Sequence, residues 1–107
     1  MEQRPHQGGS DRGTILATLR AREAELRAAG VAALYLFGSA ARGEATEHSD
    51  VDLFLDQADP AAFDLLDLVA LGEQIGGVLG ATVDLATRGS LHPVLRPAIE
   101  ASAVRVF

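Results

Sequence analysis

The sequence predicts a small α/β domain in which helices cover a small sheet. Short apolar runs typical of buried strands alternate along the chain with longer amphipathic stretches typical of helices. With 107 residues the chain is long enough for one domain and too short for two. Its hydrophobic content of 48% excludes a disordered chain.

The first half of the chain predicts a tail, a helix and a strand. Residues 1–13 are polar, contain one Pro and three Gly, and predict a flexible tail before a domain of residues 14–107. An amphipathic pattern that stops at Gly30 predicts a helix over residues 14–29. The apolar run 31–37 predicts a buried strand.

The rest of the chain predicts three more strands and two more helices. A polar loop with one helical turn near Ser39 leads to a strand over residues 51–55. Asp59 and Pro60 are typical of a helix start, and Gly80 of its end. The remaining predicted elements are a strand at 82–86, a short or kinked helix within 90–102, and an edge strand at 103–107.

The charge balance excludes several classes of partner. The chain has nine basic residues, all Arg, against fifteen acidic ones, and a net charge of −6. Such a surface repels polymeric nucleic acid and anionic membranes. No apolar run approaches the roughly 20 residues of a membrane span, and the absence of Cys favours a reducing cytoplasm.

Three carboxylates predict a metal site. Asp50 and Asp52 are two positions apart at the start of a strand and therefore point to one face. Their repulsion is relieved by a hard divalent cation such as Mg²⁺, which takes carboxylates together with phosphate oxygens. Asp84, on the next predicted strand, adds a third acid, and three such acids can hold two metal ions and position an attacking hydroxyl.

Gly38 and Ser39 predict a phosphate site beside these acids. Gly38 lets the backbone approach a ligand closely, and Ser39 supplies a hydroxyl and the start of a helical turn. The connection of ten residues between Ser39 and Asp50 implies an antiparallel strand pair that brings the two together. Each feature taken alone is more often a turn or a solvated strand end, so the prediction depends on their combination.

Several other polar residues have a simpler structural interpretation. Arg88 either faces the substrate or contacts a helix start, and His48 is more simply a loop residue. A solvated face or helix capping explains four further acids, Asp56, Asp59, Asp64 and Asp67. Tyr35 is explained by packing on the face of the sheet.

The segment GSAARGEATEHSDVDLFL resembles the signature of the nucleotidyltransferase fold that DNA polymerase beta shares. The likeness is to the minimal nucleotidyltransferases and extends over nearly all of residues 14–107. It implies a mixed sheet flanked by helices in a single domain. It also implies transfer of a nucleoside monophosphate from an NTP, commonly ATP, with two Mg²⁺ ions.

The resemblance also implies roles for individual residues. Gly38 and Ser39 would bind the β- and γ-phosphates, and Asp50 and Asp52 would hold both metal ions. Asp84 would bind one metal ion and orient or deprotonate the acceptor hydroxyl. For Arg42, a contact to the triphosphate and a place in a solvated turn are both open.

The short chain leaves little room for acceptor contacts, so a partner protein is expected to supply them. Minimal nucleotidyltransferases of this kind are encoded beside HEPN-domain toxins and act as their antitoxins. The resemblance therefore implies AMP transfer from ATP to a hydroxyl of such a toxin, with tyrosine as the expected acceptor. Two alternatives stay open: an antitoxin that neutralises its partner by binding alone, and a homodimeric enzyme that modifies a small molecule.

Overall fold

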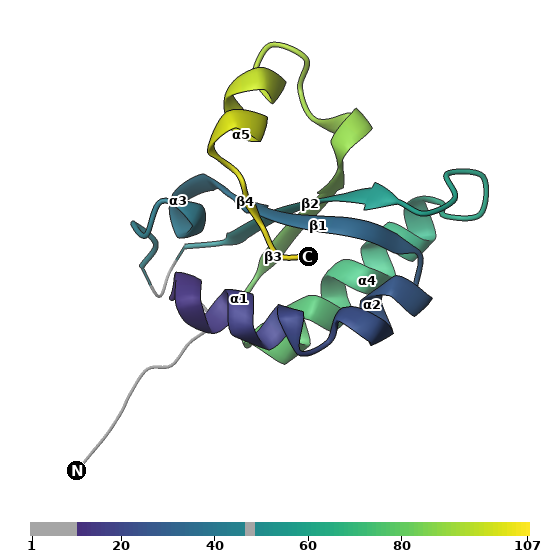
Figure 1. Cartoon of the computed structure of the whole chain (residues 1–107), viewed down its shortest axis with the longest axis horizontal. Coiled ribbons are helices and arrows are strands. Elements are labelled where there is room, and N and C mark those ends of the chain that lie inside the picture. The colour runs from purple at the N-terminus through teal and green to yellow at the C-terminus, as the bar shows by residue number, and fades with distance from the viewer. Residues whose placement is uncertain (1–10, 47–48) are drawn as a thin grey trace.

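The sheet of the computed structural model has four strands in the order β3-β2-β1-β4 (Figure 1). The structure describes residues 11–46 and 49–107. β1 is antiparallel to β2 and to β4, whereas β2 and β3 are parallel, so the sheet is mixed as expected. The strands are β1 Val31–Phe37, β2 Val51–Gln57, β3 Val83–Thr87 and β4 Val104–Arg105.

Helices lie on both faces of this sheet. One face is covered by three helices, and α5 stands over the opposite face (Figure 1). The covering helices are α1 Arg12–Arg20, α2 Glu23–Ala28 and α4 Leu65–Leu79. The remaining elements are α3 Gly38–Ala41, the 3₁₀ turn η1 Arg88–Ser90 and α5 Arg96–Ser102.

The core lies between the sheet and the three covering helices. Alternate residues of β1 and β2 point into it, because successive side chains of a strand face opposite sides. Within the described residues every fully buried side chain is apolar. The core includes Ile15, Leu19, Leu26, Leu34, Leu36, Leu53, Leu55, Leu71 and Ile75. The same alternation sends Asp52, Phe54 and Asp56 to the face under α5, so that face carries the polar chemistry.

The predicted helix over residues 14–29 is wrong in one respect, because two helices occupy that segment. α1 ends at Arg20, and Arg22 has a non-helical backbone (φ −109°, ψ 16°) before α2 begins. Leu19 and Leu26 are both buried, and their spacing of seven residues suits an unbroken helix equally well. At the break between α1 and α2, Arg20 donates hydrogen bonds to the carbonyls of Arg105 and Val106.

The predicted start of the second long helix is also wrong. α4 begins at Leu65 and not at Pro60, because Asp64 and Asp67 form a capping box. The Asp67 amide donates to Asp64 at 3.0 Å, and the Asp64 amide donates to Asp67 at 2.9 Å. Asp59 instead accepts from the Ala61 amide in the preceding turn. The end is as predicted, with Gly80 in the left-handed region (φ 66°).

Most other elements confirm their predictions to within two residues. The strand 31–37 is confirmed, and those at 51–55 and 82–86 are found at 51–57 and 83–87. The C-terminal edge strand is confirmed but is shorter. α1 begins at Arg12, two residues early, and residues 1–10 of the predicted tail lie outside the described residues. No helix in the described ranges is both long and apolar enough to cross a bilayer.

Candidate active site

Two of the predicted carboxylates lie directly opposite each other in the sheet. The parallel register of β2 and β3 pairs Asp52 with Asp84. The antiparallel register of β1 and β2 pairs Asp52 with Phe37, the last residue of β1. Gly38 follows Phe37 and opens α3, so the glycine turn and both carboxylates meet at one end of the sheet. The sequence does not reveal that Asp84 lies beside Asp52, because the two residues are 32 positions apart. The β2–α4–β3 crossover brings them together.

The chain can pass Asp52 only because residue 38 is a glycine. Gly38 has a φ of 74°, a region that other residues rarely adopt. A Cβ atom at this position would also lie less than 3.0 Å from the Asp52 carboxylate. The backbone of Gly38 therefore touches the acid directly and turns Ser39 into α3, which confirms the predicted helical turn.

The acids at this site influence one another. The pKa of Asp52 is raised above its ordinary value, first by burial and then by the negative charges of Asp84 and Asp50. The positive charge of Arg42 acts in the opposite direction. Asp50 immediately precedes β2 and is exposed. All three predicted carboxylates thus act within one electrostatic environment that is short of positive charge.

The carboxylate oxygens of Asp52 and Asp84 are suitable ligands for a hard cation. Among the described residues no group of three His, Cys, Asp or Glu side chains is spaced to hold one metal ion. The pair Asp52 and Asp84 nevertheless offers carboxylate oxygens, which are the ligands that Mg²⁺ prefers. The raised pKa of Asp52 shows that a compensating cation would relieve repulsion at this position.

Arg42 lies near the acids but also has a partner of its own. Its Nε donates to Glu44 Oε1 at 2.9 Å, and both side chains are largely exposed. An exposed ion pair of this kind contributes little stability, so Arg42 can exchange Glu44 for an anionic ligand at small cost. His48 lies outside the described residues.

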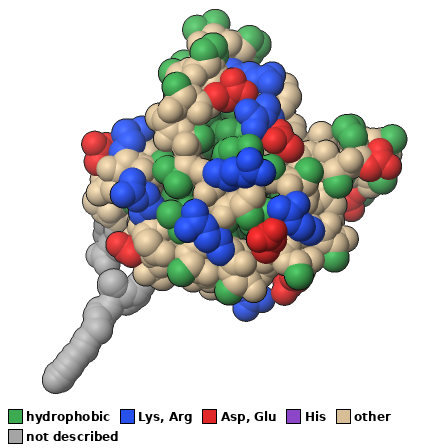
Figure 2. Space-filling model, in the orientation of Figure 1, with side chains coloured by type: hydrophobic (Ala, Val, Ile, Leu, Met, Phe, Trp, Pro, Cys, Tyr) green, Lys and Arg blue, Asp and Glu red, His purple; other side chains and the backbone are tan. Residues whose placement is uncertain are grey.

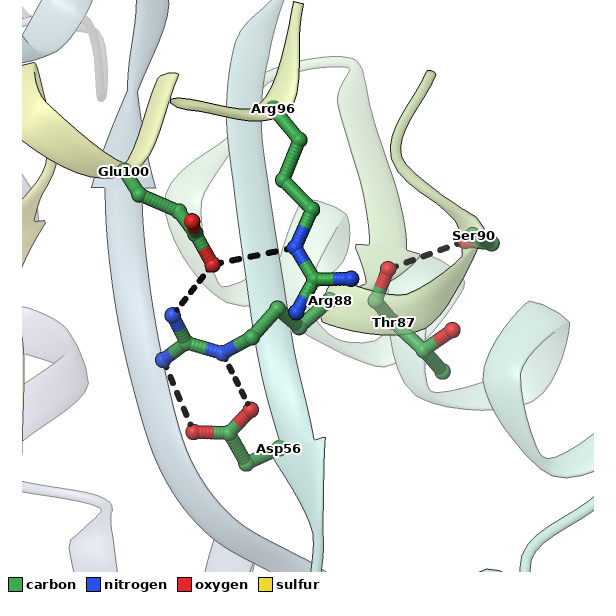
Figure 3. Close-up of polar contacts among 6 residues, drawn as sticks. All are labelled: Asp56, Thr87, Arg88, Ser90, Arg96 and Glu100. Carbon is green, nitrogen blue, oxygen red and sulfur yellow. Dashed lines mark hydrogen bonds and ion pairs between the residues drawn. The ribbon is translucent and has the colours of Figure 1, made fainter. Parts of the chain in front are cut away.

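Arg88 is held by acids on the same face of the sheet, away from Asp84. Its Nε and Nη2 donate to Asp56 at 2.7 and 2.9 Å, and its Nη1 donates to Glu100 at 2.8 Å (Figure 3). The interpretation of Asp56 as a solvated or capping residue is therefore wrong. The guanidinium also lies 4.8 Å from the ring centre of Tyr35 and 5.0 Å from that of Phe54.

Sequence reasoning missed this cluster. Alternation along β2 places Asp52, Phe54 and Asp56 on one face, which was a usable signal. The partner of Asp56 had no such signal, because Arg88 is 32 positions away and arrives only through the parallel pairing of β3 with β2. The stacked rings of Tyr35 and Phe54, 4.8 Å apart, confirm sheet-face packing for Tyr35.

Comparisons with known proteins agree with this architecture. The family model described as nucleotidyltransferase domain matches residues 18–106. The protein adenylyltransferase MntA of Thermococcus cleftensis is 41% identical over 78 residues, which cover 72% of this chain and 77% of MntA.

Two solved structures have the same fold. One, assigned provisionally as a minimal nucleotidyltransferase, superposes with a TM-score of 0.75 at 34% identity, over 88% of this chain and 94% of that one. Another belongs to the MntA–HpeT toxin–antitoxin, with a TM-score of 0.63 at 26% identity, over 91% and 72% of the two chains. Since the family model spans most of the residues that build the sheet and its acids, the chain belongs to the nucleotidyltransferase domain family.

Proposed function

We propose that this chain transfers AMP from ATP to a hydroxyl group of a partner protein toxin and thereby acts as its antitoxin. The observation that carries the proposal is the pairing of Asp52 with Asp84, with the Gly38 backbone against Asp52. The relative MntA is named a protein adenylyltransferase, and a solved neighbour comes from a toxin–antitoxin, which supports this direction.

The site residues take the following roles in this proposal. Asp50, Asp52 and Asp84 hold two Mg²⁺ ions, and bound Mg²⁺ supplies positive charge for the triphosphate and for the attacking oxygen. Gly38 and Ser39 bind the β- and γ-phosphates, because only a glycine leaves the backbone close to the acids and Ser39 adds a hydroxyl donor. Arg42 exchanges Glu44 for a phosphate oxygen.

The reaction is an in-line displacement at the α-phosphorus. The acceptor oxygen forms a bond to this phosphorus as the bond to pyrophosphate breaks. Asp84 accepts the proton of the acceptor hydroxyl, since it lies beside Asp52 at the edge of the sheet where an acceptor can enter. Positioning and charge neutralisation account for most of the catalysis in such a step.

The proposed acceptor is a tyrosine of a HEPN-domain toxin that binds this chain in a hetero-oligomer. A protein acceptor agrees with the name of the relative MntA, a protein adenylyltransferase, and with the toxin–antitoxin neighbour. The affinity of the site for polymeric nucleic acid is expected to be low, because the net charge is −6.

The test uses ATP labelled at the α-phosphate, Mg²⁺ and the protein encoded by the neighbouring gene, which the proposal expects to be a HEPN-domain toxin. We expect label on the toxin with the wild type, at least 100-fold slower labelling with Asp50→Ala/Asp52→Ala, and none when EDTA removes Mg²⁺. Mass spectrometry of the labelled toxin identifies the acceptor residue.

Three results would count against parts of this proposal. A toxin that stays unlabelled with wild type and Mg²⁺ would exclude protein adenylylation. Neutralisation of the toxin by the double variant would instead favour an antitoxin that acts by binding alone. Label found only on small molecules, together with a homodimer in sedimentation, would favour the third alternative.

A further inference from the structure

A groove with a volume of about 630 Å³ lies between α4 and β3. Its lining is mostly apolar and includes Leu68, Val83 and Leu85. Leu65 and Val69 of α4 line it as well and remain 71% and 52% exposed, which is unusual for side chains of this size. Asp84 also lines the groove, but the register that pairs it with Asp52 places its carboxylate on the face of β3 opposite to α4.

β3 is an edge strand of the sheet. In the described part of the chain its pairing is with β2 alone, whereas β4 covers the opposite edge of the sheet. An exposed edge can pair with an extended segment of another protein through backbone hydrogen bonds. Every second side chain of such a segment would then enter the groove beside α4.

The segment that builds the groove is strongly acidic. Residues 43–87 include β2, α4 and β3 and contain ten of the fifteen acidic residues but neither Arg nor Lys. All nine Arg residues lie outside this segment. Figure 2 shows Arg side chains gathered around β4 and α1, at the opposite edge of the sheet from β3. Charge is therefore distributed unevenly along the chain, and the segment that contains both walls of the groove carries no Arg or Lys of its own.

This charge pattern selects the occupant of the groove. Glu73 and Asp84 line it. Arg42 and Arg88 balance two of the ten negative charges in this segment, and two bound Mg²⁺ ions would neutralise only four of the remaining eight. A second copy of the chain would bring two acidic segments together, whereas Lys or Arg side chains would be attracted. The apolar lining and the acidic surroundings together fit an extended segment that combines apolar and basic residues.

We infer that the α4–β3 groove is the docking site for an extended basic segment of the acceptor protein. This inference depends on the proposed function, because the occupant is the protein that receives AMP. A segment docked along β3 would turn alternate side chains into the groove and toward the face that carries Asp84, and would so hold the acceptor hydroxyl beside this carboxylate. Recognition of the acceptor is thereby separated from the nucleotide, which binds at Gly38 and Ser39.

The inference is tested with Val69→Lys and Glu73→Lys, which reverse the apolar and acidic character of the groove. Neither residue belongs to the proposed catalytic or nucleotide site. Val94→Lys is the matched control, because Val94 is 78% exposed and lies outside the groove in the segment before α5. All three changes are at exposed positions, and circular dichroism checks that the variants fold.

The measurements are kcat and KM for the acceptor protein used in the AMP-transfer test above, and the affinity for Mg²⁺ with α,β-methylene ATP. We expect Val69→Lys and Glu73→Lys to raise KM at least tenfold and to leave kcat and nucleotide affinity within twofold of wild type. Val94→Lys should leave all three unchanged. Raising the salt concentration should weaken acceptor binding, and less so for Glu73→Lys.

Failure of this inference is distinguishable from failure of the proposed function. If the wild type transfers AMP and both groove variants keep a KM within twofold of wild type, the docking site is elsewhere and the function stands. If the wild type transfers no AMP, the proposed function fails. The docking site is then tested by the Kd of the wild type and of the groove variants for the same protein, and a Kd that the groove variants leave unchanged would overturn it. Self-association of the wild type that Val69→Lys abolishes would assign the groove to a second copy and overturn the inference.

Discussion

Gly38 is the residue at which backbone conformation and chemistry depend on each other most directly. Its positive φ allows the turn after β1, and its missing side chain leaves room for the Asp52 carboxylate. Gly43 provides a natural comparison, because its φ of 72° is nearly the same but a Cβ there would meet nothing within 4 Å. Comparing substitutions at the two glycines therefore distinguishes the effect of backbone strain from the effect of contact with Asp52.

We predict that Gly38→Ala lowers the rate of AMP transfer at least 100-fold, because the new methyl group displaces Asp52. Gly43→Ala should lower the rate less than threefold. Gly43→Ala should reduce the free energy of unfolding by about 1 kcal/mol, the ordinary cost of an alanine at positive φ, and Gly38→Ala should reduce it by more, because its methyl group also displaces Asp52. Transfer kinetics and urea denaturation of the two variants check this, and equal rates would show that the contact with Asp52 is unimportant.

At the scale of elements, the start of α4 shows how local hydrogen bonds override a plausible sequence signal. Asp59 and Pro60 have the composition of a helix start, yet the reciprocal bonds of Asp64 and Asp67 place it five residues later. Phe63, just before this cap, is buried against Gly30. Burial of one aromatic side chain and two satisfied amides outweigh the preference of Pro60 for the first turn.

We predict that Asp64→Ala lowers the free energy of unfolding by about 1 kcal/mol, since it removes the cap from an amide of the first turn. Asp59→Ala should cost less than half as much, because the hydrogen bond that the Asp59 side chain accepts from the Ala61 amide lies in an exposed turn. Urea denaturation at pH 7 compares the two. A larger loss for Asp59→Ala would mean that the helix begins earlier than Leu65.

At the scale of the whole molecule, the Arg88 cluster ties α5 to the sheet. Arg88 joins Asp56 of β2 to Glu100 of α5, and Arg96 donates to Glu100 at 3.1 Å (Figure 3). Hydrogen bonds from Arg88 lower the pKa values of both Asp56 and Glu100. The two acids therefore have lower pKa values in the folded chain than in the unfolded one. Their contribution to stability is complete at a pH above the pKa values of the unfolded chain. It is lost as the pH falls through the pKa values of the folded chain.

We predict that the wild type loses stability between about pH 5 and pH 3 more steeply than Asp56→Asn, which lacks one of these titrating groups. At pH 7 the substitution should cost about 1 kcal/mol, since it breaks a half-exposed pair with two hydrogen bonds. Urea denaturation at several pH values checks both. Glu23→Gln, which breaks the exposed pair with Arg27, is the control and should change neither quantity measurably.

The motif residues and most strands could be predicted from the sequence because their signals are local. An apolar run of seven residues, a glycine at a turn and two acids in alternation each depend on neighbours within a few positions. The break between α1 and α2 could not be predicted, because the bonds that Arg20 makes there reach residues 105 and 106. The partner of Asp56 could not be predicted for the same reason.

By itself the sequence predicted which residues would carry the chemistry: Gly38, Ser39, Asp50, Asp52 and Asp84 stand out by their spacing and strand alternation. Only the tertiary structure decided that Asp84 lies opposite Asp52, that Arg88 ties α5 to the sheet, and that an apolar groove runs between α4 and the strand that carries Asp84. The physical reason is that strand register and side-chain pairing join residues far apart along the chain, and the free energy that selects them comes from packing the whole sheet against its helices.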